Sequence, residues 1–219
     1  MRALFIAGAH TDVGKTYVAC ALIAAARARG LSVEAFKPAV SGLDPADWGD
    51  SDPGRLLAAL GRPLTEANLQ AMSPLRFAAA LSPPMAARRE GQSLRLETLI
   101  TLCDQARAQA HADLMLIEGA GGVMSPISED ATNLDLMVAL GLPVVLVGGS
   151  YLGAISHTLT AAEVLRARGL KVAALVISQD ADPAAPDFAE TLADVRRFSS
   201  GARVIAAPRG GQDWASDLL

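Results

Sequence analysis

The chemistry-bearing residues of this chain begin with Gly14-Lys15-Thr16, close to the N-terminus. A short apolar run (residues 3–7) precedes them, and an alanine-rich stretch with helical character (residues 15–29) follows. In such a strand–loop–helix order, loop N–H groups and the positive end of the helix dipole bind an anion. We expect Lys15 to reach the terminal phosphates of a nucleotide and the Thr16 hydroxyl to ligate Mg2+.

The spacing of this loop departs from the common phosphate-binding pattern. The first glycine of that pattern falls on Ala9, whereas Gly8 lies one residue earlier. The loop therefore either contains one extra residue or carries alanine in place of its first glycine. A chance Gly-Lys-Thr in a chain rich in alanine and glycine is the alternative, and the flanking strand and helix patterns argue against it.

Charged residues also stand at or after the ends of other apolar runs. Lys37 closes the run 33–37, and Pro38 stops any helix there, so its side chain should project into a crevice. Asp50-Ser51-Asp52 could hold a metal, or Ser51 or Asp52 could cap a helix over 53–60, and both interpretations can hold together. Glu118 ends the run 114–117, where a second Mg2+ ligand is needed opposite the loop.

Two glycine-rich turns follow apolar runs at the same expected edge. Gly119-Ala120-Gly121-Gly122 would let the backbone approach a ligand closely. The turn 148–154 either binds a carboxylate through helix N–H groups or is a tight turn alone. The three histidines, His10, His111 and His157, show no metal-ligand spacing.

Apolar runs alternate with helical patterns along the whole chain, which predicts an α/β fold with a doubly wound, mainly parallel sheet in one domain, residues 1–219. Ligands of such sheets bind at the carboxyl ends of the strands. Residues 41–92 are rich in Asp, Pro and Gly, and we expect an irregular excursion over that edge. The expected strands are 3–7, 33–37, 114–117, 144–147, 172–177 and 204–206, and the expected helices are 15–29, 53–60, 95–110, 132–140, 154–168 and 187–198.

Composition excludes several classes of protein. The net charge is −4 and no run of Lys or Arg occurs, which argues against nucleic acid or an anionic membrane as partner. Cys20, expected in buried packing, and Cys103 lack metal-ligand spacing, so we expect a reducing cytoplasm. Residues 136–149 are apolar but interrupted by glycine and proline, which favours helix, turn and strand over a membrane span. The run 3–7 is too short for a signal peptide.

Taken together, these motifs resemble those of the dethiobiotin synthetase family. That family has a longer loop of the form G-x5-G-K-T with an acid at the position of Asp12. The match covers residues 3–170 in order. It also includes K-P-x-x-S-G at 37–42, S-D at 51–52 and E-G-A-G-G at 118–122, with weaker matches at Ser82-Pro83, Glu90-Gly91, Leu152-Gly153 and His157.

The resemblance implies a three-layer sandwich like that of P-loop NTPases and a defined reaction. The family uses ATP and Mg2+ to close the ureido ring of dethiobiotin from 7,8-diaminononanoate and CO2. It is a cytoplasmic homodimer, and the turn near Leu152 receives the substrate carboxylate from the neighbouring subunit. By position, Lys37, Lys15 and Thr11 would serve catalysis, and Thr16, Asp52 and Glu118 would ligate Mg2+.

The resemblance also implies two sets of binding residues. The residues that would face the diamine and its carbamate are Thr11, Lys37, Ser41, Ser82, Leu152 and Gly153. The residues that would contact the nucleotide are Asp12, Val13, Gly14, Lys15, Thr16, Tyr17, Asp52, Glu118, Gly119, Ala120, Gly121, Ser178, Gln179, Pro208, Arg209 and Gly210. Ser178-Gln179 stands where the family often has Asn-Asp, and Arg209-Gly210 differs too, so preference for ATP over other nucleotides is open.

Two other classes share a related loop. Cobyrinate and cobyrate amide synthases add a glutaminase domain, for which 219 residues are too few. Partitioning and division-site ATPases carry an additional lysine early in the loop, where this chain has Gly8-Ala9-His10.

Overall fold

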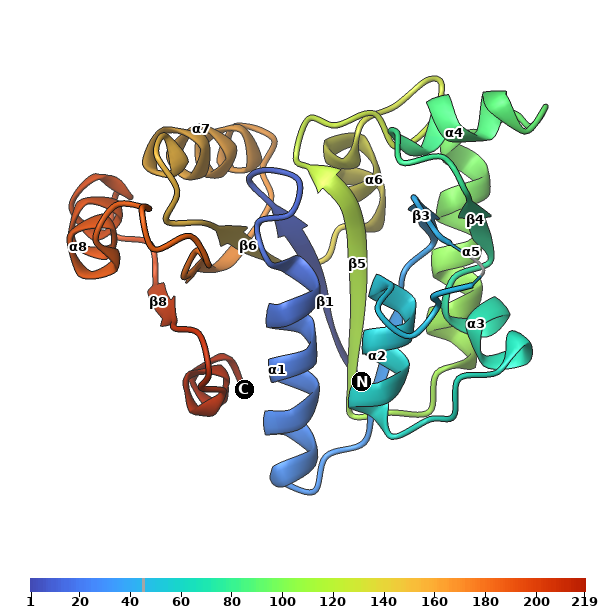
Figure 1. Ribbon diagram of the computed structural model, residues 1–219, viewed down its shortest axis with the longest axis horizontal. Coiled ribbons are helices and arrows are strands. Elements are labelled where there is room, and N and C mark those ends of the chain that lie inside the picture. Colours follow the sequence, from blue (N-terminus) through green and yellow to red (C-terminus); the bar gives the residue numbers. More distant parts are fainter. Residues whose placement is uncertain (45) are drawn as a thin grey trace.

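A six-stranded parallel sheet forms the centre of the protein in the computed structural model, which describes residues 1–44 and 46–219 (Figure 1). The strand order is β2-β5-β1-β6-β7-β8, and β3 and β4 form a separate parallel pair. The strands are β1 (Arg2–Gly8), β2 (Val33–Phe36), β3 (Ala39–Ser41), β4 (Leu75–Phe77), β5 (Leu114–Gly122), β6 (Val144–Gly148), β7 (Val172–Ser178) and β8 (Val204–Ala207).

Helices cover both faces of the sheet, because every central strand is apolar on both sides. Along β1, Leu4 and Ile6 enter one core, whereas Phe5 and Ala7 enter the other. The first core is shared with α1 and α2, and the second with α5 to α8. The helices are α1 (Lys15–Ala28), α2 (Asp52–Leu60), α3 (Glu66–Met72), α4 (Pro83–Arg89), α5 (Leu96–Gln109), α6 (Asn133–Leu140), α7 (Ala154–Ala167), α8 (Phe188–Phe198) and the short 3-10 helix η1 (Asp213–Leu218).

The arrowheads of β1 and β5 point to the same edge of the sheet, and the loop into α1 lies there (Figure 1). A parallel sheet necessarily collects the carboxyl ends of its strands at one edge. This edge brings together the segments that follow Gly8, Phe36, Glu118, Gly148 and Ser178. The fold therefore fixes which loops can share a ligand.

The strands and helices predicted for the central sheet and its covering layers are confirmed within one residue at each end, except that β5 extends through Gly122. The expectation of an irregular segment over 41–92 is wrong. Besides the predicted helix α2, that stretch contains α3, β4 and α4, because short helices with polar caps do not need a long apolar period. Cys20 is half-buried, not fully buried as expected. Within the described ranges, no helix is long and apolar enough to cross a membrane.

Candidate nucleotide and magnesium site

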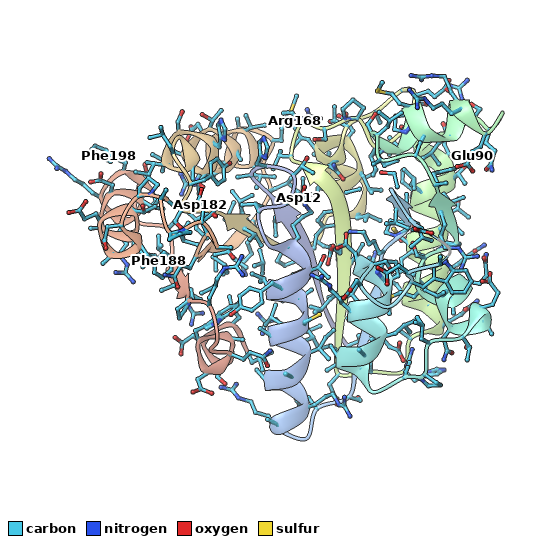
Figure 2. The ribbon with its side chains drawn as sticks, viewed as in Figure 1. Asp12, Glu90, Arg168, Asp182, Phe188 and Phe198 are labelled. Carbon is cyan, nitrogen blue, oxygen red and sulfur yellow. The ribbon has the colours of Figure 1, made fainter. Side chains whose placement is uncertain are left out.

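The loop between β1 and α1 contains two residues with positive φ angles. Asp12 and Gly14 adopt left-handed conformations, with φ of 57° and 97°. Gly14 caps α1 and offers no side chain, so the first N–H groups of the helix remain available to an anion. Figure 2 shows Asp12 at this edge, directly above α1.

Gly8 serves as the first glycine of the loop, which therefore contains one extra residue. A Cβ atom at Gly8 would lie 2.7 Å from the carbonyl oxygen of His10, closer than side chains allow. Ala9 donates its N–H to the carbonyl of Val147 (2.8 Å) and continues the sheet contact. The chain thus needs glycine at position 8 and tolerates alanine at 9.

Four predicted site residues converge below this loop. The Thr16 hydroxyl lies 2.8 Å from Asp52 Oδ1 and 2.8 Å from Glu118 Oε1. The Lys37 ammonium lies 2.5 Å from Glu118 Oε1 and 2.8 Å from Asp52 Oδ2. Residues from α1, α2, β5 and the end of β2 thus form one polar cluster at the sheet edge.

Burial makes the charges of this cluster depend on one another. Burial alone would lower the pKa of Lys37, which is 1% exposed, but Glu118 and Asp52 outweigh it and raise that pKa. Burial would raise the pKa of Asp52, yet the Lys37 ammonium lowers it to about 2. For Lys15, burial and the nearby Lys37 ammonium together lower the pKa.

The expectation that Lys37 projects into an open crevice is wrong for this structure. Its side chain points toward the sheet edge but ends between two acids, where it also donates weakly to the carbonyl of Gly119 (3.4 Å). Lys37 is not part of the lining of the adjacent cavity, although its partner Asp52 is, whereas Lys15 belongs to the lining. The sequence could not show this, because Asp52 and Glu118 are brought to Lys37 only by the fold.

The donor set of the cluster fits a hard divalent cation. Glu118 Oε2 is buried and has no hydrogen-bond partner among the residues that the structure describes. It lies in a group that also offers the Thr16 hydroxyl and the Asp52 carboxylate, and Mg2+ prefers oxygen ligands. Among the residues that the structure describes, no group of three or more His, Cys, Asp and Glu side chains could hold a metal ion by itself. A bound Mg2+ would therefore need further oxygens from phosphate and water.

A cavity of about 440 Å³ adjoins the cluster. Its lining includes the α1 N-terminus, with Lys15 and Thr16, and the segment after β7, together with Arg209. Most of the predicted nucleotide-contacting residues line it. The lining is Asp12, Val13, Gly14, Lys15, Thr16, Tyr17, Asp52, Arg55, Gly149, Tyr151, Ser178, Gln179, Asp180, Arg209 and Gly210.

Comparisons with known proteins identify the family. A family model described as an AAA domain matches residues 2–207. The ATP-dependent dethiobiotin synthetase BioD of Phenylobacterium zucineum (strain HLK1) is 61% identical over 219 residues, which are 100% of this chain and 94% of that protein. The protein of that name from Caulobacter vibrioides (strain NA1000 / CB15N) is 57% identical over 219 residues, 100% of this chain and 98% of its own.

The chain belongs to the ATP-dependent dethiobiotin synthetase family. The resemblance drawn from the sequence motifs is thereby confirmed. Solved structures of low identity agree on the fold. The MinC:MinD cell division protein complex of Aquifex aeolicus gives a TM-score of 0.59 at 11% identity, covering 100% of this chain and 86% of that one. The signal recognition particle receptor FtsY of Elizabethkingia anophelis gives a TM-score of 0.55 at 16% identity, covering 99% of this chain and 63% of that one.

Some residues predicted from the dethiobiotin synthetase motifs lie outside the cavity. The predicted nucleotide-contacting residues that are not part of its lining are Glu118, Gly119, Ala120, Gly121 and Pro208. Thr11 is exposed at the tip of the loop, and its Oγ1 would lie 3.6 Å from a Cβ atom at Gly121. The glycine-rich segment 119–122, expected to be a turn, is the end of β5 and packs against the phosphate-binding loop.

The residues predicted to face the diamine are dispersed around the edge. Ser41 donates to the carbonyl of Leu81 (2.5 Å), and the neighbouring Ser82 Oγ is buried without a partner among described residues. Leu152 is 88% exposed beside Gly153, at the start of α7. Glu90, from the weaker motif match, accepts the N–H of Ala78 and lies far from Asp12 (Figure 2).

Sequence reasoning missed four contributors to the site. Arg55 lies three positions after Asp52, a spacing that places both on one helix face, and this signal could have revealed it. Tyr151 lies in the glycine-rich turn 148–154, which the sequence had indicated without this residue, and Asp180 enters the cavity from a segment without a recognisable motif. Asn133, at the first turn of α6, donates to the carbonyls of residues 120 and 122 and so holds the glycine turn.

The histidines do not form a metal site. His10 and His157 stack with ring centroids 5.4 Å apart, and His10 Nδ1 contacts the carbonyl of Thr11 (2.8 Å). Tyr151 completes the group by a hydrogen bond to His157 Nδ1 (2.8 Å). This aromatic group links the phosphate-binding loop to the turn before α7.

Proposed function

We propose that this protein is an ATP- and Mg2+-dependent cyclo-ligase that forms the ureido ring of dethiobiotin from 7,8-diaminononanoate and CO2, as a single-domain enzyme of biotin synthesis. The observation that carries the proposal is the convergence of Lys37, Asp52, Glu118 and Thr16 beside a phosphate-binding loop. Relatives named ATP-dependent dethiobiotin synthetase cover the whole chain at up to 61% identity and support the same conclusion.

In this proposal, Thr16, Asp52 and Glu118 hold Mg2+, and Lys15 binds the terminal phosphates. Bound Mg2+ would neutralise phosphate charge and so favour attack on the γ-phosphorus. The carboxylates of Asp52 and Glu118 supply oxygen ligands, and Glu118 Oε2 has no hydrogen-bond partner among the described residues. Lys15 is 7% exposed, so its charge acts where water screens it weakly.

The reaction balances in three steps. One amine of the diamine adds to CO2 and loses a proton, giving a carbamate. A carbamate oxygen attacks the γ-phosphorus and ADP leaves, giving a mixed carbamic–phosphoric anhydride. The second amine then attacks the carbonyl carbon, phosphate leaves and a proton is lost. Lys37 and Lys15 offset the repulsion between carbamate and triphosphate, which is about 4 kcal/mol for unit charges 4 Å apart at an effective dielectric of 20.

We further propose a cytoplasmic homodimer in which the turn at Leu152 and Gly153 receives the substrate carboxylate of the neighbouring subunit. The 88% exposure of the apolar Leu152 side chain supports a covering partner. Ser41, Ser82 and Thr11 would contact the diamine within one subunit. Both cysteines carry free thiols, which fits a reducing compartment.

The test is product formation from defined substrates. Purified protein is incubated with ATP, Mg2+, bicarbonate and 7,8-diaminononanoate, and dethiobiotin is sought by mass spectrometry. We expect product and ADP in equal amounts, neither of them without the diamine. ATP hydrolysis that does not depend on the diamine, with no dethiobiotin, would contradict the proposal and favour a nucleotide switch. Glu118→Gln is the matched inactive control.

A further inference from the structure

The far wall of the cavity depends on one tyrosine hydroxyl. Tyr17 Oη lies 2.7 Å from the carbonyl oxygen of Pro208 and 2.7 Å from that of Gly211. A phenol has one hydrogen, so it donates to one of these carbonyls at a time. Tyr17 stands two residues after Lys15 in the first turn of α1. The hydroxyl thus joins the helix that holds phosphates to the segment 208–211.

Three further hydrogen bonds hold the segment 208–211 in place. The Arg209 backbone N–H donates to Gln179 Oε1 (3.0 Å) and its Nε–H to the Gln179 carbonyl (3.3 Å), and Trp214 Nε1–H donates to the carbonyl of Gly211 (2.9 Å). Because a backbone N–H only donates, the Gln179 amide oxygen must face Arg209. The two N–H donors of that amide therefore remain for another partner on the cavity side.

The position of this wall assigns it to the nucleoside part of a nucleotide. Phosphates belong at the opposite end, where Lys15 and the α1 N-terminus lie. Beside the wall, a Cβ atom on Gly14 would lie 2.6 Å from Ser178 Oγ, so Ser178 packs tightly against the loop. The space left for a base and ribose is bounded by Gln179, Arg209 and Gly210.

We propose that Tyr17 is a positioning residue for the nucleoside: its hydroxyl holds segment 208–211 against the cavity and thereby sets how much the base and ribose add to triphosphate binding. This inference rests on the proposed use of ATP. Gln179 contributes from the same wall as a hydrogen-bond donor to an acceptor atom of the base. Neither side chain is proposed to contact the phosphates.

The experiment separates the nucleoside from the phosphates. Calorimetry gives the dissociation constants of ATP and of inorganic tripolyphosphate, both with Mg2+, for wild type, Tyr17→Phe and Thr191→Val. The dissociation constant of tripolyphosphate divided by that of ATP measures what the nucleoside adds. One hydrogen bond corresponds to a factor of about 2–12 in an equilibrium constant, so Y17F should lower the ratio by about three- to tenfold. T191V also loses a hydroxyl that donates to a backbone carbonyl, that of Asp187 (2.8 Å), but Thr191 is not part of the cavity lining, so this variant should keep the ratio.

Each result decides the matter. An unchanged ratio in Y17F, or equal weakening of ATP and tripolyphosphate, would overturn the inference while leaving the phosphate site intact. A wild type that binds neither compound would overturn the proposed function, and this inference with it. Should Y17F unfold too readily to titrate, Gln179→Glu serves instead. It keeps an acceptor for Arg209 N–H but removes the donors, so the ratio should again fall, and a wild-type ratio would contradict the proposal.

Discussion

At the residue scale, Lys37 carries a charge that two acids already neutralise. Its ammonium lies between Asp52 and Glu118, the groups proposed to hold a cation. A divalent cation near these acids would repel the ammonium and favour its movement toward an anionic substrate. The position of Lys37 is thus compatible with a role in turnover that is separate from nucleotide affinity.

Replacing Lys37 by methionine should therefore reduce turnover by about 100-fold or more, because one positioned charge in a dry site is worth several kcal/mol in the transition state. ATP affinity should change by less than about threefold, because Lys37 is buried behind Asp52 and is not part of the cavity lining. Steady-state kinetics and calorimetry measure the two effects. Wild-type turnover in K37M ends this interpretation, and a thermal scan checks that the variant is folded.

The carboxylate of Asp52 gives a second residue-scale prediction. Its pKa is about 2 in the folded chain, below the ordinary 3.8. A carboxylate whose folded pKa is depressed stabilises the fold above its unfolded pKa, and loses that contribution as pH falls from about 4 to about 2. In urea titrations across this range, the unfolding free energy of Asp52→Asn should therefore fall less steeply than that of wild type. Parallel curves would show that Asp52 makes no such contribution.

At the element scale, α7 approaches the end of β6 so closely that only glycine fits. A Cβ atom on Gly148 would lie 2.2 Å from Oγ1 of Thr158 and 2.9 Å from its Cγ2. Thr158 is buried, and its Oγ1 has no hydrogen-bond partner within the described chain. This contact places the turn before α7 at the cavity edge.

Gly148→Ala should destabilise the protein by about 1–3 kcal/mol through overpacking. Thr158→Ala removes both opposing atoms, so the double variant should lose less than the sum of the single variants, by about 1 kcal/mol or more. Urea unfolding measures this coupling. Gly49→Ala is the control, since nothing lies within 4 Å of a Cβ atom there. Strict additivity would contradict the packing argument.

At the scale of the whole molecule, nucleotide binding should stabilise the fold by mass action. ATP with Mg2+ at 100 times its dissociation constant adds about 2.7 kcal/mol. For a chain of this size we expect a rise of about 5–10 °C in the unfolding temperature by scanning calorimetry. Adding a chelator should remove most of the shift. Equal shifts with and without chelator would mean that Asp52 and Glu118 hold no cation.

Association of two chains is the second expectation at this scale. Sedimentation equilibrium should give twice the mass of one chain. Leu152→Asp should shift the protein toward monomer, because it places a charge on an apolar side chain proposed to be covered. Its turnover should fall while its affinity for ATP stays within about twofold. A monomeric wild type with full turnover would contradict the shared site.

Elements with strong apolar periodicity could be placed from the sequence, because burial on both faces of a parallel sheet leaves a local pattern. Within 41–92 the sequence predicted α2 but not α3, β4 or α4, because these elements are short and depend on caps and on packing. The anion site at the loop around Gly14 could also be predicted, because its glycine, lysine and threonine are adjacent in the chain. For Arg55 the sequence offers only a helical spacing, for Tyr151 only its place in a glycine-rich turn, and for Asp180 no local signal.

The sequence by itself determined the doubly wound parallel sheet, the phosphate-binding loop and membership of the synthetase family, since each rests on residues adjacent in the chain. Only the tertiary structure decided that Lys37 ends between Asp52 and Glu118, and that Tyr17 bonds carbonyls nearly 200 residues away. Such partners are chosen by the folding of distant segments onto one sheet edge, and side-chain charge and hydrogen bonding act through space, not along the chain.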